Sequence, residues 1–437
     1  MRKKRGLGLY LAILGSVISG AVLVSTCSPP PTPTPVPTFT PTPTVTSTPT
    51  PEPPTSTPTP APLSLVVWHD LPDDQAAQLG KEISQFQPSP QAFQIDLQRY
   101  EGEPMLERAL SGGSIDFDVV LGNAHAVGFM RDKHLIQPVD NLFSTEFLHG
   151  LARPGREGVI HESQIWGVPH TLGLQLMLFY NTKLVTTPPA DTASLIDTAS
   201  RLTGSGRYGL GMNSLDPLWL MPWLSAYGGW PTDDQGKPTL NTEPMVRALT
   251  FLHGLAYERK VMAAAIDYDT GLNAFKKGQT ALWIDGDWVL SSLREAQDVQ
   301  WGVARLPILA ETNLEPACLI AGKYFVIGAH VNGEKLEAAR LLIERLVGME
   351  SEKRWTESFR VLPSSLAVLN DALVREDPFL RISTAQMLTG RGVGLSGDMQ
   401  RAMDAMRGPL EDVMSNRIAP AEAARGMQAR VDASSVR

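Results

Sequence analysis

Apolar positions in the central part of the chain fall into short runs that alternate with stretches of helical spacing. Residues 63–68 form an apolar run rich in β-branched side chains and predict a buried strand, and residues 92–97 and 117–121 predict two more strands. Between them, residues 76–86 and 105–110 repeat their apolar positions with the period of a helix. Strands that alternate with helices predict an α/β fold with a mainly parallel sheet.

Polar side chains stand where two of these strands end. The first strand runs into Trp68, His69 and Asp70, and the third runs into Asn123. Because ligands of open α/β sheets bind beyond the carboxyl ends of the strands, we expect these four residues at a binding site. Trp68 continues an apolar run, so a core position is an equal alternative for it.

The extreme N-terminus has the pattern of an export signal. Basic residues at positions 2–5 precede an uncharged, apolar run over residues 6–24, which by its length could also be a permanent membrane anchor. The sequence Leu-Val-Ser-Thr-Cys at residues 23–27 resembles the lipobox of bacterial lipoproteins, so we interpret residues 1–27 as a lipoprotein signal peptide with Cys27 as the lipidated residue. This interpretation places the rest of the chain at the outer face of the cell membrane, held by a lipid anchor.

A linker is expected next. Residues 28–62 hold 15 prolines, 12 threonines and a single charged residue, Glu52. Such a segment cannot bury a core and favours an extended polyproline II conformation. The sequence therefore predicts a globular part, residues 63–437, tethered at a distance from a membrane.

The charge balance and the cysteine count exclude several classes of partner. The net charge is −8, and outside residues 1–27 the chain holds 34 basic and 46 acidic residues, which gives it no electrostatic footprint for nucleic acid. Two cysteines in 437 residues exclude a disulfide scaffold and a cysteine-rich metal cluster. We expect no metal and no cofactor. The G-x-S-x-G, H-E-x-x-H and P-loop motifs of common enzymes are also missing from the sequence.

Five motifs in order carry a resemblance to a known family. They are Asp118-Val-Val-Leu-Gly-Asn123, Leu135-Ile-Gln-Pro-Val-Asp140, Trp166-Gly-Val-Pro-His170, Leu178-Phe-Tyr-Asn181-Thr-Lys183, and Ala274-Phe-Lys-Lys-Gly278 followed by Ala281-Leu-Trp-Ile-Asp285-Gly-Asp-Trp288. Together they resemble the extracellular solute-binding proteins of ABC importers, in the maltose and multiple-sugar binding branch. Leu282 and His170 depart from the family pattern. The departure at His170 bears on which sugar the protein prefers.

The resemblance implies two α/β lobes of the periplasmic-binding-protein type, joined by a hinge that the chain crosses more than once. The crossings are expected near residues 172–174, 319–322 and 362–363. Lobe 1 would then comprise residues 63–172 and 319–365, and lobe 2 residues 173–318 and 366–437. Such proteins bind a solute in the cleft between the lobes and close on it.

The family binds sugars with aromatic rings and hydrogen-bonding side chains, which suit the apolar face and polar rim of a pyranose. By its place in the late motif, Trp288 is the first candidate, with Asp285 beside it and Asp287 as a helix cap. His170 and Gln175 bracket the first crossing, and Tyr324 follows the second.

The segment 216–230 adds an aromatic group at helical spacing. Asp216 before Pro217 is a natural helix N-cap. Trp223 and Tyr227 are expected in the core, whereas Trp219 and Trp230, at the two ends of the helix, are expected to reach the cleft. Of the remaining candidates, Arg360 is expected in a surface ion pair and Cys318 as a buried small residue.

The resemblance and the tether together predict a monomeric binding protein that delivers a carbohydrate to an ABC permease and performs no catalysis. Three alternatives stay open. The same fold could bind a polyamine or a polyol phosphate, it could serve a membrane receptor as a sensor, or the chain could be a secreted glycosidase that pairs Asp285 with Asp70 or Asp216.

Overall fold

The computed structural model describes residues 63–86, 93–100 and 116–434. All described residues belong to one compact unit, Pro60–Arg437, which we call the second unit because the chain divides before it. The predicted signal peptide, Cys27, the linker and the helix over residues 105–110 therefore lie outside the described residues. Within the described part, no helix is long and apolar enough to span a bilayer.

The first sheet of the second unit contains eight strands. Its main path runs β13-β7-β12-β3-β1-β2, and β4 and β14 pair with β12. Parallel pairing joins β1 to β2 and β3, whereas β12 runs antiparallel to β3, β4 and β7. The strands are β1 (Leu63–His69), β2 (Phe93–Arg99), β3 (Val119–Asn123), β4 (Ile136–Gln137), β7 (Val168–Gly173), β12 (Leu319–Gly328), β13 (Leu362–Pro363) and β14 (Arg391–Gly392).

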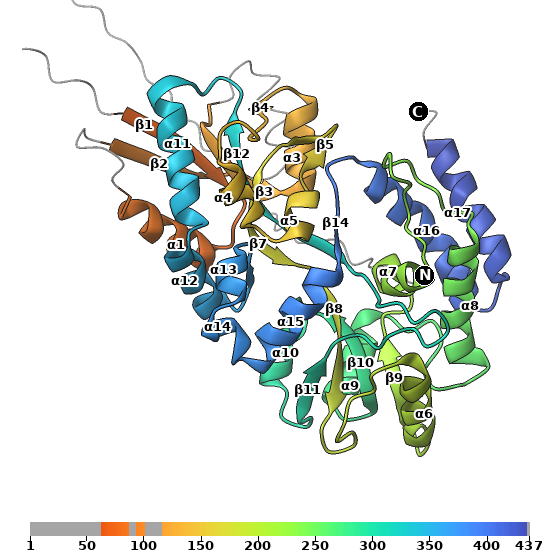
Figure 1. The fold of residues 1–437 in the computed structure, drawn as a ribbon. Helices are drawn as coiled ribbons and strands as arrows, with labels where there is room; N and C mark the ends of the chain where they lie inside the picture. The colour runs from red at the N-terminus through yellow and green to blue at the C-terminus, as the bar shows by residue number, and fades with distance from the viewer. Residues whose placement is uncertain (1–62, 87–92, 101–115, 435–437) are drawn as a thin grey trace, which may run out of the picture. The chain divides into compact units, whose positions relative to one another are not determined.

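Helices cover both faces of this sheet (Figure 1). One face packs on α1 (Asp73–Ser84), α11 (Gly333–Leu346) and α12 (Met349–Phe359), and the other on α3 (Ala124–Asp132) and α5 (Arg153–Glu157). The division follows from the period of two in a strand, since Phe325 and Ile327 join the first core and Tyr324 and Val326 the second. The small elements at the rim are α4 (Thr145–His149), β5 (Ile160–His161) and β6 (Gln164–Ile165).

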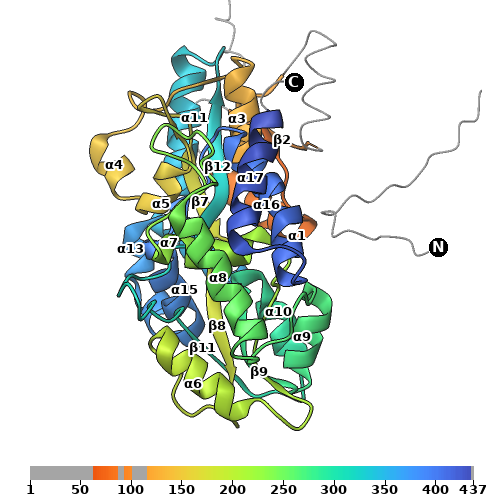
Figure 2. The same cartoon turned by 90° about the vertical axis from the view of Figure 1, so that its right-hand side faces the viewer.

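The second sheet has the order β11-β8-β10-β9, from β8 (Leu176–Asn181), β9 (Tyr208–Met212), β10 (Thr280–Gly286) and β11 (Trp301–Ala304). Strands β9 and β10 are parallel, and β8 runs antiparallel to β10 and β11. Around it lie α6 (Thr192–Leu202), α9 (Tyr268–Lys276), the 3₁₀ helix η1 (Asp287–Val289), α10 (Leu290–Glu295) and α15 (Pro378–Thr389). Helices α13 (Leu366–Leu369) and α14 (Ala372–Arg375) connect β13 of the first sheet to α15. Figure 2 shows α7 (Pro217–Ala226), α8 (Glu243–Tyr257), α16 (Asp398–Met414) and α17 (Pro420–Ser434) packed together.

The predicted strands and the first helix are confirmed, with shifted ends. The first helix begins at Asp73, three residues before the expected start, because Asp73 and Asp74 are favourable in a first helical turn. It ends at Ser84, and Phe86 is buried beyond it. The α/β architecture expected from the alternating pattern is therefore present. The expectation of a mainly parallel sheet is wrong, because β12 and β8 run antiparallel to most of their neighbours. The boundaries of the two lobes are not tested by these contacts and stay a prediction.

A glycine allows the segment before α16 to pack on the first sheet. Gly128 lies in α3, and a Cβ on it would collide with the backbone carbonyl of Leu395, whose side chain is buried beside that helix. We expect Gly128→Ala to lower the free energy of unfolding by about 1–3 kcal/mol, because backbone must shift to admit the methyl group. Equilibrium denaturation measures this loss.

Gly254→Ala in α8 is the matched control. Its added Cβ would meet nothing closer than Glu258 Oε2 at 3.7 Å, so alanine is expected to be neutral or stabilising by up to about 1 kcal/mol. Equal stability of the wild type and Gly128→Ala would contradict the tight packing of Leu395 on α3.

Candidate functional site

The parallel strands of the two sheets end near one crossing of the chain. In the second sheet, β9 ends at Met212 and β10 at Gly286, and the helices that follow start at Pro217 and Asp287. In the first sheet, β1 ends at His69 and β3 at Asn123. Ligands of α/β sheets bind beyond such ends, so we examined the side chains there first.

Three aromatic side chains cluster beyond β9 and β10, and we call this cluster the aromatic platform: Trp219, Tyr268 and Trp288. The Trp219 ring lies 5.9 Å from the ring of Trp288, edge to face, and 5.9 Å from that of Tyr268. Trp288 is 38% exposed, although tryptophan is a residue that folding usually buries. Its indole lies over Gly286, where any Cβ would collide with the ring. The exposed part of the platform is therefore the Trp288 ring, which the buried Trp219 and the half-buried Tyr268 support.

Polar contacts hold the platform from below. The indole N–H of Trp288 donates to the Tyr268 hydroxyl at 3.0 Å, and that of Trp219 donates to the Ile284 carbonyl at 2.7 Å. Asp285 is completely buried and accepts hydrogen bonds from Trp283 Nε1 and from the Gly286 amide, each at 2.8 Å. Burial raises the pKa of Asp285 to about 7. Asp285 thus supports the platform and does not form part of its surface.

An ion pair borders the platform. Asp216 caps α7 by accepting from the Leu218 amide, as the sequence predicts, and its other oxygen binds Arg407 of α16 at 2.8 Å. Both side chains keep solvent access, 26% for Asp216 and 52% for Arg407. A charged pair beside aromatic rings can hydrogen-bond the hydroxyl groups of a ligand that stacks on the rings.

The strand ends of the first sheet carry a second polar group. Asp70 forms an ion pair with Lys323 at 2.7 Å, and Lys323 stands opposite Asn123 in the pairing of β12 with β3. Asn123 is exposed and caps α3 by accepting from the Ala126 amide. His69 is buried and accepts from the Leu71 amide, and burial lowers its pKa. Asp70, Asn123 and Lys323 are therefore the solvent-accessible groups of this end.

The first crossing connects the two strand ends. Leu174, between β7 and β8, has a left-handed backbone with φ of 79°, and its amide donates to Asp287 Oδ1 at 3.1 Å. Asp287 is the residue before Trp288, and burial raises its pKa to about 6. The cap of this short helix is Gly286, so the predicted capping role of Asp287 is wrong. Its carboxylate instead ties the platform to the crossing, where Lys323 lies opposite Thr171 of β7.

Seven of the predicted ligand contacts are buried in the structure: Trp68, His69, His170, Gln175, Trp219, Asp285 and Tyr324. Trp219 is 4% exposed and belongs to the core, so the expectation that it reaches the cleft is wrong. Trp68 packs on Tyr100 and Phe117, and its indole donates to Gln98. His170, Gln175 and Tyr324 have no exposed surface. The His170 ring lies against Phe325 and Trp355, Gln175 donates to Ser383, and Tyr324 faces the α5 side of the sheet. The alternation of side chains along β7 and β12 turns His170 and Tyr324 to the interior.

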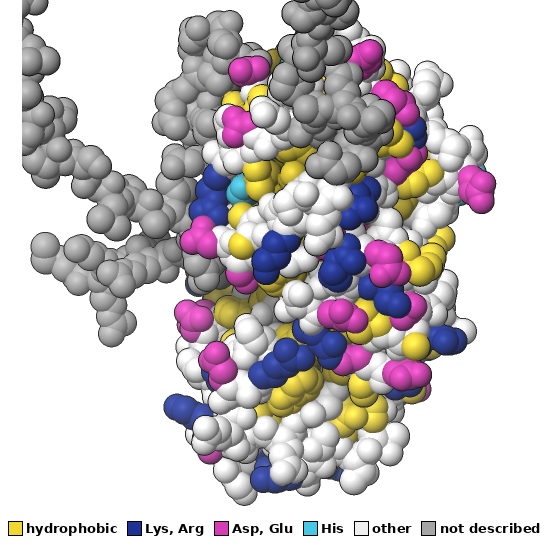
Figure 3. Space-filling view, turned by 90° about the vertical axis from the view of Figure 1, so that its left-hand side faces the viewer, with side chains coloured by type: hydrophobic (Ala, Val, Ile, Leu, Met, Phe, Trp, Pro, Cys, Tyr) yellow, Lys and Arg dark blue, Asp and Glu magenta, His cyan; other side chains and the backbone are white. Residues whose placement is uncertain are grey.

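Other predictions about single residues agree with the structure. Trp223 and Tyr227 belong to the core, and Cys318 is buried. Arg360 forms an ion pair with Asp377. Basic and acidic side chains are interspersed on the face drawn in Figure 3, so this face offers a polyanion no continuous basic surface.

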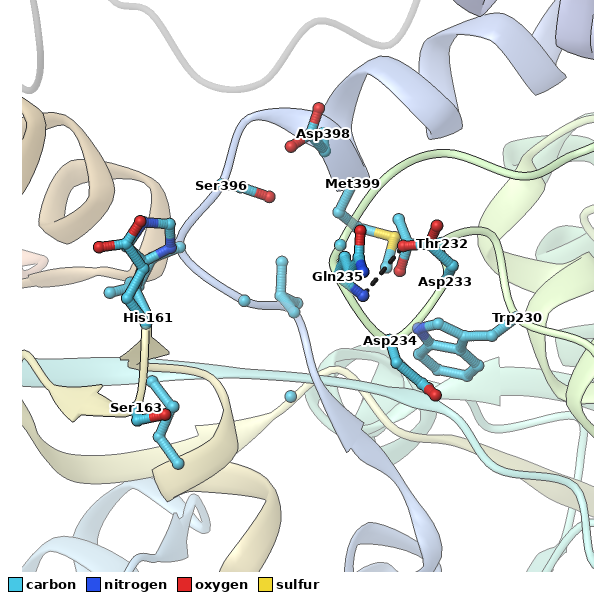
Figure 4. Close-up of a pocket in the computed structure, with 17 residues that line it drawn as sticks. His161, Ser163, Trp230, Thr232, Asp233, Asp234, Gln235, Ser396, Asp398 and Met399 are labelled. Carbon is cyan, nitrogen blue, oxygen red and sulfur yellow. Dashed lines mark hydrogen bonds and ion pairs between the residues drawn. The ribbon is translucent and has the colours of Figure 1, made fainter.

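Trp230 does not join the platform and lines a separate cavity of about 600 Å³. Figure 4 shows His161 and Ser163 on one wall, the turn from Thr232 to Gln235 on another, and Asp398 and Met399 on a third. The guanidinium group of Arg391 lies 4.9 Å from the centre of the Trp230 ring and covers one face of it. This cavity is a second place for a ligand, and it lies beside Gly392, the carboxyl end of β14, which runs parallel to β12.

Two residues of the site were not found in the sequence. Tyr268 opens α9, directly after its cap Asp267, and Arg407 lies 191 positions after Asp216. A tyrosine at a helix start and an arginine in the middle of a helix have no local feature that marks them. The sequence pattern alone could not have identified either one.

Comparison with known proteins gives a consistent result. The family model described as "Bacterial extracellular solute-binding protein" matches residues 93–381. The maltotriose-binding protein of Pyrococcus abyssi is 23% identical over 329 residues, which is 72% of this chain and 70% of that protein. Two solved structures are similar in fold. A maltose/maltodextrin-binding domain from Bdellovibrio bacteriovorus bound to maltotriose has a TM-score of 0.66 and 24% identity, and covers 86% of this chain and 100% of its own. An extracellular solute-binding protein from Staphylococcus aureus in complex with maltose has a TM-score of 0.76 and 17% identity, and covers 86% and 98%.

Proposed function

The chain belongs to the bacterial extracellular solute-binding proteins, and from this premise we propose that it captures a carbohydrate on the aromatic platform and delivers it to the permease of an ABC importer. The observation that carries the proposal is the exposed ring of Trp288, supported by Gly286, Tyr268 and Trp219. The exposed face of the Trp288 ring presents an apolar surface on which a pyranose ring stacks. The sugars named for the relative and the similar structures are maltose and maltotriose.

Hinge closure is part of the proposal. The lobes would be residues 63–172 with 319–365 and residues 173–318 with 366–437, and a ligand would be gripped between the platform and the group formed by Asp70, Asn123 and Lys323. The contact of Asp287 with Leu174 supports this view, because it places the platform next to the segment that must bend. A ligand drives closure only by its higher affinity for the closed state.

We further propose that the protein acts as a monomer, that a lipid on Cys27 anchors it to the outer face of the membrane, and that residues 28–62 hold the binding unit away from the surface. The support is the sequence of residues 1–62, which combines a basic start, an apolar run and a proline-threonine tract. Incorporation of labelled fatty acid into the wild type but not into Cys27→Ala would support the anchor.

A binding role without turnover accounts better for the acidic residues than a glycosidase does. Asp285 is fully buried under its own strand and cannot reach a glycosidic bond, and Asp216 is committed to a helix cap and an ion pair. A polyamine or polyol phosphate in the same fold has no observation in its favour.

Thermal unfolding of the protein with a panel of solutes tests the proposed function. The panel contains mono- and oligosaccharides, spermidine, glycerol phosphate and divalent metal ions. A ligand present at 100 times its dissociation constant stabilises the folded state by about 2.7 kcal/mol, which raises the midpoint measurably. We expect a shift with maltose or maltotriose. A shift of the midpoint with spermidine or glycerol phosphate alone would contradict a carbohydrate ligand. If no compound of the panel shifts the midpoint, capture of any of these solutes is contradicted.

A further inference from the structure

We propose that Tyr268 is a positioning residue for ligand binding, which fixes the Trp288 ring through the hydrogen bond that the Trp288 indole N–H donates to the Tyr268 hydroxyl. The inference rests on the proposed function, because it assigns a role in the platform to a residue that the sequence does not mark.

The Tyr268 hydroxyl contacts the Trp288 side chain. It accepts from the indole N–H of Trp288 at 3.0 Å. A phenolic oxygen can accept a hydrogen bond, and an indole N–H can only donate one, so the two groups are matched. The ring of Tyr268 is itself held between Trp219, at 5.9 Å, and Trp283, at 6.5 Å.

Tyr268 packs on a fixed part of the second sheet. Its ring lies 6.5 Å from the ring of Trp283, whose indole N–H donates to Asp285. Asp285 is fully buried in β10 and also accepts from the Gly286 amide. The surface against which Tyr268 packs is therefore set by the sheet.

The Trp288 ring needs this support. Trp288 is 38% exposed, it lies over a glycine that offers no side chain to grip it, and its one ring–ring contact within the described residues is with Trp219. Without the hydroxyl, the indole N–H loses the one hydrogen bond it makes within this part of the chain. A ring that is free to turn must be ordered when the ligand binds, and this ordering reduces affinity.

The test combines ¹⁹F NMR with maltotriose binding, on full-length protein labelled with 5-fluorotryptophan. A detergent without a sugar headgroup is used, because a maltoside would compete for the platform. The chain has nine tryptophans, and Trp288→Phe assigns the signal of Trp288. We expect Tyr268→Phe to shift and broaden that signal and to weaken maltotriose binding about three- to tenfold, the usual range for loss of one hydrogen bond.

Tyr257→Phe is the matched control. Its hydroxyl donates to the Met414 carbonyl at 3.0 Å, so the same atom is removed elsewhere around the second sheet. This variant should leave both the Trp288 signal and the affinity unchanged. In a Trp288→Ala background, Tyr268→Phe should have no further effect on affinity, since the role acts through Trp288.

Two results would overturn the proposal. One is an unchanged Trp288 signal in Tyr268→Phe. The other is that Tyr268→Phe lowers the affinity equally in the wild-type and in the Trp288→Ala background. That result would mean that the hydroxyl acts on the ligand without Trp288. If the wild type binds no maltotriose, the proposed sugar fails, while the NMR comparison still decides whether Tyr268 holds Trp288.

Discussion

Replacing Trp288 with alanine is expected to weaken maltotriose binding by at least about fivefold, more than ~1 kcal/mol, because an exposed aromatic ring that stacks on a sugar contributes strongly to binding. The apo protein should keep its unfolding midpoint, since the ring is 38% exposed and packs over the side-chain-free Gly286. Isothermal titration calorimetry measures the affinity, and a thermal scan without ligand measures the fold.

Trp230→Ala separates the platform from the second cavity. Trp230 is also a predicted ligand contact, but it lines the cavity of about 600 Å³ between the turn at Thr232 and the start of α16. If the sugar binds on the platform, Trp230→Ala should change the affinity by less than about twofold. Loss of binding in Trp230→Ala with normal binding in Trp288→Ala would move the ligand to that cavity and contradict our assignment.

The second large effect concerns stability in acid and depends on His170. The ring is completely buried between Phe325 and Trp355, and neither nitrogen has a hydrogen-bond partner among the described residues. Burial lowers the pKa of His170 to about 3, although the charge of Glu82 opposes the shift. Below pH 6.5 the His170 imidazole therefore binds a proton in the unfolded chain but not in the folded chain. The free energy of unfolding consequently falls as the pH falls from 6.5 toward 3.

His170→Phe should remove this loss. The variant keeps an aromatic ring between Phe325 and Trp355 and cannot take up a proton. We expect the difference in free energy of unfolding, variant minus wild type, to rise by about 1.4 kcal/mol for each pH unit that the pH is lowered. Between pH 6.5 and 4 the rise amounts to about 3 kcal/mol. Urea denaturation at a series of pH values measures this difference. The contributions of the carboxyl groups to the pH dependence are common to both proteins and cancel in it. Parallel curves would show that His170 is not desolvated.

Some of the site could be predicted because its signals are local. Asp216 precedes a proline at a helix start, and Asn123 ends an apolar strand, so both positions followed from neighbours in the sequence. Trp288 was found by its place in a family motif, and the structure gives it an exposed ring near a crossing. The ligand contact of Trp288 remains a prediction.

The rest could not be predicted because it depends on which face of an element is turned inward. Trp68, His170, Gln175 and Tyr324 stand near strand ends or crossings, yet the packing on both sides of the sheet buries them. Polar type and position in a motif favour a ligand contact for His170, but its burial depends on Phe325 and Trp355, more than 150 residues further along the chain.

The sequence by itself determined the α/β class, the first strands and the first helix, the family, and the helix cap at Asp216, because periodicity, capping and short motifs act between residues close in the chain. Only the tertiary structure decided that Tyr268 supports Trp288, that Arg407 pairs with Asp216, and that Asp287 binds the amide of Leu174. Those contacts join residues 20, 191 and 113 positions apart. Contacts at such separations form only when the sheets and helices have packed, since a pattern along the chain does not specify distances across it.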